Sequence, residues 1–172
     1  MKKGLILTFS LLIIVIHLNA QDNYFAQWDE NYTAINIDEL LNAEQAYADS
    51  IETHYGDSMQ FYLRVDKYRF PARFTGNIRK MSDERKSLMH YIFKMVGVDM
   101  QTTQIKNEVE IVTQDGTIWM PIQRQLEKPF KKEVSDKANV YLYTFFMNHH
   151  SKSKMLVNLF LISEFNTERE RN

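Results

Sequence analysis

Cysteine is absent from the 172-residue chain. Its absence excludes disulfide bonds, a thiol nucleophile, a zinc site built on thiolates and a lipid anchor attached through cysteine. A chain of this size without disulfides must rely on its hydrophobic core, and it is long enough to build one. Apolar residues make up 44% of the sequence, so a sufficient core is plausible.

The common catalytic and nucleotide-binding motifs are also missing. No GxGxxG, GxxxxGK[ST], HExxH or GxSxG pattern occurs. His149 and His150 are adjacent, so on a strand they would point to opposite faces and only on a loop would they share a metal ion. We therefore assign no catalytic residue, no metal ligand and no cofactor. A small hydrolase that uses His90 or His150 with a carboxylate is kept as an alternative.

The first residues have the pattern of a secretory signal peptide. Lys2 and Lys3 precede an apolar run, Leu5–Leu18, and Ala20 provides a small residue before Gln21. The run is shorter than the roughly 20 residues of a membrane-spanning helix. We expect residues 1–20 to be removed and the protein to be periplasmic or extracellular in a Gram-negative bacterium, without a transmembrane span. An uncleaved N-terminal anchor is the alternative.

Charge is distributed unevenly along the chain. Gln21–Asp57 holds nine acidic residues and no Lys or Arg, whereas Arg64–Lys94 holds nine basic and three acidic residues. This asymmetry indicates either an interaction surface or an acidic segment that lies against a basic one within the fold. The amphipathic pattern favours internal pairing. Basic and aromatic residues, Lys67 among them, also form a strip at Arg64–Arg79, and export argues against a nucleic-acid partner for this strip.

Two helices are predicted, over residues 36–56 and 82–97. Gly56 and Gly97 suit the ends of these helices because glycine adopts the left-handed conformation readily. Ser82 suits the cap of the second helix. The first helix is expected to bury one stripe of side chains, which comprises Ile37, Leu40, Leu41, Tyr47, Ala48, Ile51 and Tyr55.

Strands are predicted over residues 59–80, where Pro71 breaks or bends the chain, and over a β core at 107–165. The core begins with a hairpin, because Asp115-Gly116 separates two alternating runs and suits a type I′ turn. That turn would pair Ile111 with Met120 and Val109 with Ile122 on one apolar, inner face. It would pair Val112 with Trp119 on the opposite face. Pro121 indicates that the returning strand is an edge strand or carries a bulge.

The rest of the core is expected to contain two strands that are buried on both faces. Val140–Met147 and Met155–Phe165 are apolar on both sides, and Asn148–Lys154 between them reads as a hairpin loop. Gln123–Val134 has the spacing of a helical turn. The predicted fold is a single α+β domain over residues 21–165. It is a bent antiparallel sheet or small open β-barrel (SH3-like or OB-like) with two packed helices. Residues 166–172 are predicted to form a frayed tail.

Two sets of residues are candidates for binding. Trp119, Pro121 and Gln123 place a large aromatic ring and an amide on the predicted edge strand, where they form a peptide or ligand groove or else belong to a second small core. Trp28 and Tyr32 have helical spacing, which indicates a carbohydrate-stacking strip or an aromatic segment docked on the domain.

Three parts of the sequence resemble features of uncharacterised bacterial secreted small-β-domain proteins. They are the W-x-P-x-Q pattern at residues 119–123, Leu142-Tyr143, and Asn158 with Glu164-Phe165. The resemblance covers residues 107–165, and Ser135–Ala138 departs from the Gly-Asp expected there. It implies a compact barrel-like domain and carries no activity or ligand. From the leader pattern and the lack of catalytic motifs, we expect an exported, non-catalytic protein that binds another envelope protein or a surface glycan. An inhibitor or immunity-type partner of a secreted protein is a further alternative.

Overall fold

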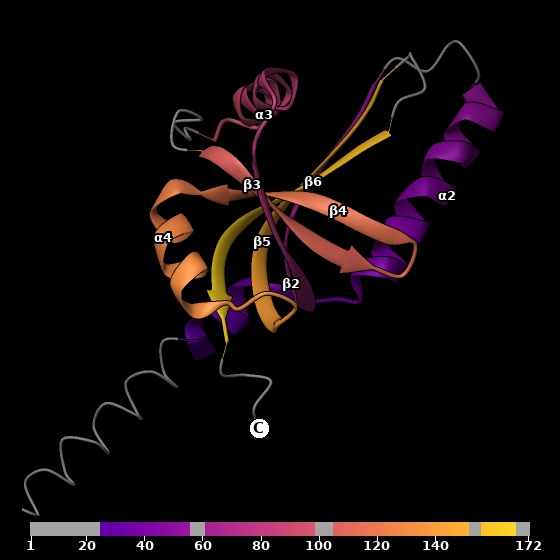
Figure 1. The fold of residues 1–172 in the computed structure, drawn as a ribbon. Coiled ribbons are helices and arrows are strands. Elements are labelled where there is room, and N and C mark those ends of the chain that lie inside the picture. Colours follow the sequence, from indigo (N-terminus) through magenta and orange to yellow (C-terminus); the bar gives the residue numbers. More distant parts are fainter. Residues whose placement is uncertain (1–24, 56–60, 99–104, 152–155, 168–172) are drawn as a thin grey trace, which may run out of the picture.

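The computed structural model describes residues 25–55, 61–98, 105–151 and 156–167. The predicted signal peptide and most of the predicted tail lie outside these ranges. Within them, no helix is both long and apolar enough to cross a bilayer. Figure 1 shows, after a helix over residues 25–31, the elements β1 (Thr33–Ala34), α2 (Ile37–Tyr55), β2 (Phe61–Lys80), α3 (Asp83–Met95), β3 (Ile105–Thr113), β4 (Gly116–Gln123), α4 (Arg124–Glu133), β5 (Asn139–Ser151) and β6 (Leu156–Asn166).

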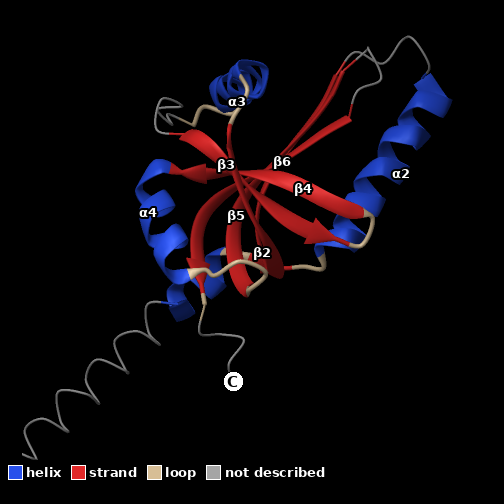
Figure 2. Cartoon of the chain, viewed as in Figure 1, coloured by secondary structure: helices blue, strands red, loops and turns tan. Residues whose placement is uncertain are grey.

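Five strands close into a barrel in the order β2, β3, β4, β6 and β5, and β5 pairs again with β2. Neighbouring strands run antiparallel except β4 and β6, which run parallel and meet at Ile122 and Ile162. The predicted α+β class with a small barrel is confirmed. The barrel is closed, however, and the described chain forms four helices around it instead of two (Figure 2).

The long strand β2 joins the two sides of the barrel. Its first part, up to Arg73, pairs with β5, and its remainder pairs with β3. Pro71 lies within this single strand and does not interrupt it. The register shifts between Phe74 and Ile78, where Gly76 has a φ of 101° that glycine adopts without the strain of a side chain.

Aromatic side chains fill the barrel, and α4 closes one end of it. Phe130 of α4 is fully buried, with ring centroids 5.2 Å from Phe74 and 5.1 Å from Phe165. Phe146 and Phe160 are buried as well, with ring centroids 4.8 Å apart. Pairs of this geometry stabilise a core beyond the area that they bury. The predicted helical turn at Gln123–Val134 is therefore a complete helix, which places Phe130 in the barrel core.

A second core lies between α3 and the sheet. Ser82 caps α3 as predicted, since its Oγ accepts a hydrogen bond from the Arg85 backbone N–H at 3.3 Å. Capping a helix in this way satisfies one of its free N–H groups. The buried residues of this core are Met81, Met89, Ile92, Phe93, Ile105, Met147, Leu159 and Leu161.

The contact between α2 and the strands is partly polar. Glu44, which the predicted stripe omits, is 3% exposed, whereas Tyr47, which the stripe includes, is 47% exposed. The Glu44 carboxylate accepts hydrogen bonds from Arg64 and from Nδ2 of Asn148, the latter at 3.0 Å. A buried charge is retained only when it is paired in this manner. Placing Tyr47 in the buried stripe was therefore wrong, and the acidic helix does lie against the basic strand.

The predicted hairpin is present, but its turn lies one residue earlier. Gln114 and Asp115 form the turn, and Gly116 already pairs with Thr113 at the start of β4. A type I′ turn needs positive φ at both central residues. Of the two predicted central residues only Gly116 has it, at 137°, so the type I′ prediction is wrong.

This shift changes every cross-strand partner while it preserves the faces of the strands. The observed pairs are Val109–Met120, Ile111–Ile118, Glu110–Trp119 and Val112–Thr117. The three predicted pairs are wrong, because the partner of each residue moves by two positions. A shift of two keeps each side chain on its own side of the sheet. The predicted inner residues Val109, Ile111, Met120 and Ile122 are accordingly buried.

Two further strand predictions are corrected. β4 is not an edge strand, because it pairs with β3 on one side and with β6 on the other. The loop predicted at Asn148–Lys154 is shorter, because β5 continues to Ser151 and pairs along β2 and β6. Asn148 is fully buried within that strand.

Candidate functional site

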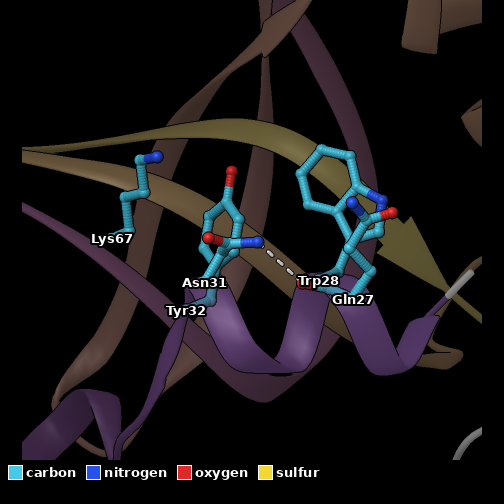
Figure 3. A pocket seen from close by; sticks show the side chains of 5 residues that line it. All are labelled: Gln27, Trp28, Asn31, Tyr32 and Lys67. Atoms are coloured by element: carbon cyan, nitrogen blue, oxygen red, sulfur yellow. Dashed lines mark hydrogen bonds between the residues drawn. The ribbon is translucent and has the colours of Figure 1, made fainter.

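A pocket of about 440 Å³ opens between the helix over residues 25–31 and strand β2. Figure 3 shows the side chains that line it, which are Gln27, Trp28, Asn31, Tyr32 and Lys67. Gln27 and Asn31 are separated by one helical turn, so they lie on the same side of the helix. The Asn31 Nδ2 group donates to the Gln27 backbone oxygen at 2.8 Å, which fixes the Asn31 amide at the rim.

The aromatic rings of this region are held by a buried tyrosine of β5. Tyr143 is fully buried, and its ring centroid lies 6.4 Å from that of Phe25, 6.0 Å from Trp28 and 5.5 Å from Tyr32. The helical spacing of Phe25, Trp28 and Tyr32 brings all three rings onto this residue. The Trp28 ring is therefore fixed in place, with Tyr32 at 5.4 Å on another side.

Arg69 and Asp29 fasten the helix to the barrel. Arg69 Nε donates to the Tyr32 backbone oxygen at 2.9 Å and lies 3.5 Å from Asp29 Oδ1. The Tyr143 hydroxyl donates to the same Asp29 oxygen at 2.9 Å. Arg69 Nη1 also donates to the Tyr141 hydroxyl oxygen at 2.9 Å. The charges of Arg69 and Asp29 are thus used within the fold, where they hold the pocket wall against β2 and β5.

The polar groups of the pocket differ in charge. Burial raises the pKa of the Tyr32 phenol, with a hydrogen bond from Ser163 opposing and the Glu164 carboxylate adding to the rise. Tyr32 is therefore a neutral phenol at neutral pH. Lys67 is exposed, and its Nζ lies 5.9 Å from the centroid of the Tyr32 ring, within the range of a cation–π contact. Lys67 is the single charged residue among the five that line the pocket.

The other predicted set lies elsewhere, on β4. Trp119 is half-buried on the outer side of the barrel, and the Arg79 guanidinium carbon lies 4.0 Å from its ring centroid. Pro121 is buried and pairs with Glu108. The Gln123 Oε1 atom accepts from Gln125 Nε2 at 2.5 Å. None of Trp119, Pro121 and Gln123 lines the pocket, whereas Trp28 and Tyr32 do.

The cations of the cluster around Trp119 are paired with a buried carboxylate. Glu108 is fully buried, and its two oxygens accept from Arg79 Nε at 3.0 Å and Arg85 Nε at 2.6 Å. Arg85 Nη2 also donates to the Trp119 backbone oxygen at 3.0 Å. Charge-assisted hydrogen bonds of this kind hold β2, β3, β4 and α3 together.

The histidines considered as catalytic residues lie on different elements. His150 Nε2 is 3.1 Å from Glu52 Oε1 of α2, and the His150 side chain is 3% exposed. Its Nδ1 has no hydrogen-bond partner in the part of the chain that the structure describes. His149 faces the ring of Tyr91 at 6.2 Å, and burial followed by the neighbouring His150 lowers its pKa. His90 is exposed on α3.

Three pocket residues were not singled out from the sequence as binding residues. Gln27 and Asn31 carry a weak signal, their i, i+4 spacing beside Trp28. Lys67 was noted only as part of a basic and aromatic strip. Its place in the pocket depends on the docking of residues 25–31 against β2, which no local pattern predicts.

Across the described ranges, no group of three or more His, Asp or Glu side chains is placed to hold a metal ion. Comparisons of the chain with family models, with curated proteins and with solved structures found no match. We therefore infer the function from the geometry of the pocket.

Proposed function

We propose that this chain is an exported, non-catalytic binding protein of the bacterial envelope or periplasm, which takes a protein or a surface glycan into the Trp28 pocket. The observation that supports this proposal is a hollow in which a fixed indole ring, two amides, a phenol and an ammonium group converge. Binding sites typically combine aromatic surface with a few well-placed polar groups. Export is supported by the leader pattern of residues 1–20.

The barrel is proposed to be of the OB type. Three observations support this: five strands, a parallel contact between the third and fifth barrel strands (β4 and β6), and a helix, α4, between the third and fourth. OB barrels bind oligosaccharides and oligonucleotides. The fold by itself does not decide the ligand, so this analogy only agrees with a binding role.

The proposal is tested by capture from a cell-envelope extract. The protein, purified after expression of the full chain, is immobilised beside its Trp28→Ala variant and a Tyr47→Ala control, in which an exposed aromatic ring on α2 is removed. We expect the wild type and the control to retain the same protein or glycan, and Trp28→Ala to lose it. Equal retention by all three proteins, or by none, would count against the proposal.

A hydrolase is the second candidate, and the pair formed by His150 and Glu52 favours it. A general base needs a reacting group within hydrogen-bond reach. His150 is covered by α2 and does not line the pocket, so this candidate has less support. Turnover on a panel of ester, amide and glycoside substrates that His150→Gln abolishes would establish it in place of the binding role.

A further inference from the structure

The cationic side chains of strand β2 beside the pocket differ in whether a carboxylate pairs with them. Arg64 donates to Glu44 and to Asp66 Oδ2, and Arg69 pairs with Asp29. Lys67 lies between them in sequence and has no carboxylate within 4.0 Å in the described part of the chain. The pocket is therefore lined by one positive charge that the fold leaves unneutralised.

The carboxylates near the pocket make other contacts, and none of them forms an ion pair with Lys67 in the described part of the chain. Asp29 is held by Arg69 and by the Tyr143 hydroxyl. Glu164 acts on the Tyr32 phenol, and one of its oxygens accepts from the Phe165 backbone N–H at 3.1 Å. An anionic group that enters the pocket therefore meets its opposite charge at Lys67 (Figure 3).

The amides and the indole ring suit a saccharide. The Gln27 side chain and Asn31 Oδ1 make no hydrogen bond within the described residues, so they are available as donors and acceptors for hydroxyl groups. The Trp28 ring offers a flat apolar surface against which the C–H face of a sugar ring can stack. Because Tyr32 and Tyr143 already fix this ring, little conformational entropy is lost on binding.

Resting on the proposed binding function, we infer that the ligand is an oligosaccharide with a carboxylate-bearing sugar, whose ring stacks on Trp28 and whose carboxylate pairs with Lys67. Gln27 and Asn31 bind its hydroxyl groups. Compared with a peptide, which offers mainly backbone amides and few hydroxyls, a sugar ring with an acid group matches more of the chemistry that lines the hollow. A protein ligand is the outcome that would replace this inference.

The test is an array of bacterial and plant oligosaccharides that contain uronic or sialic acids, each printed beside its carboxyl-reduced form. We expect wild type to bind at least one acidic glycan, and to bind its reduced form about tenfold or more weakly, as the loss of a charge-assisted hydrogen bond implies. Lys67→Gln should bind both forms equally weakly, Trp28→Ala should bind neither, and Lys94→Gln, which removes an exposed lysine of α3, should behave as wild type.

Two results would overturn the inference. Preferential binding of neutral or carboxyl-reduced glycans would show that Lys67 does not select for charge, and an array without any binding would exclude a glycan ligand. Neither result would remove the proposed binding function, which stands if a protein is still captured from the envelope extract in a Trp28-dependent manner. If neither glycan binding nor Trp28-dependent capture of a protein is found, the proposed binding function is excluded as well.

Discussion

The two tryptophans of the chain lie in two clusters of similar residue types but different electrostatics. Beside Trp119, the two oxygens of the buried Glu108 carboxylate accept from Arg79 and Arg85, and Arg79 covers the indole ring. Beside Trp28, the Lys67 ammonium faces a hollow and is paired with no carboxylate of the described chain. An aromatic ring with a cation therefore stabilises the fold where a carboxylate of the fold pairs with the cation, and offers a binding site where none does.

The largest effect on stability is expected from Glu108→Gln. The substitution leaves two arginines without their shared carboxylate, so we expect the free energy of unfolding to fall by about 1.5–3 kcal/mol, the usual value of hydrogen bonds to a charged group. Chemical denaturation of the variant and of Glu133→Gln, an exposed control on α4, measures it. A fall of the same size in both variants would mean that the Trp119 cluster is not a structural unit.

A smaller difference is expected between the two cations. Arg79→Gln removes a cation–π contact and an ion pair, and should lower the free energy of unfolding by about 0.5–1 kcal/mol. Lys67→Gln should change it by less than about 0.5 kcal/mol, as for most exposed positions. Thermal unfolding of both variants compares them directly. A larger loss of unfolding free energy for Lys67→Gln than for Arg79→Gln would contradict this comparison. It would mean that Lys67, and not Arg79, is the cation that stabilises the fold.

The smallest effect is a dependence on pH near the Trp119 cluster. Hydrogen bonds from Asn77, Thr117 and Thr75 hold the pKa of Glu110 below its ordinary value of 4.5. A lowered pKa in the folded state adds stability above pH 4.5, and this stability is lost as the pH falls through the lowered value.

We therefore expect wild type to be more stable than Glu110→Gln at pH 7. The two should converge as the pH falls from 4.5 through the lowered pKa of Glu110, because protonation of Glu110 in the wild type removes the same interactions. Unfolding curves measured between pH 7 and pH 3 provide the comparison. A gap that stays constant over this range would show that the Glu110 carboxylate is not held by those hydrogen bonds.

Much of the fold was predictable because it depends on local patterns. Alternation in β3 and β4 identified their inner faces, and Ser82 located the start of α3. Closure of the barrel was not predictable, since it depends on the contact between Ile122 and Ile162, which are distant in sequence. The turn at Asp115 was misplaced because an Asp-Gly pair fits more than one turn geometry.

The binding residues were predicted in part for the same reason. Trp28 and Tyr32 share a helical face, a local property that the sequence shows. Lys67 reaches the pocket only because β2 lies beside that helix. Trp119 was also a candidate, but the sequence does not reveal that Arg79 lies over its ring, since that contact joins two strands through β3.

Because the chain has only two tryptophans, fluorescence reports on each cluster separately. Trp119→Phe leaves Trp28 as the sole indole, and Trp28→Phe leaves Trp119. Each variant is titrated with the acidic glycan that binds most strongly on the array. The account predicts a saturable change in the emission of the protein that retains Trp28 and none in the protein that retains Trp119. A saturable change only in the protein that retains Trp119 would contradict it.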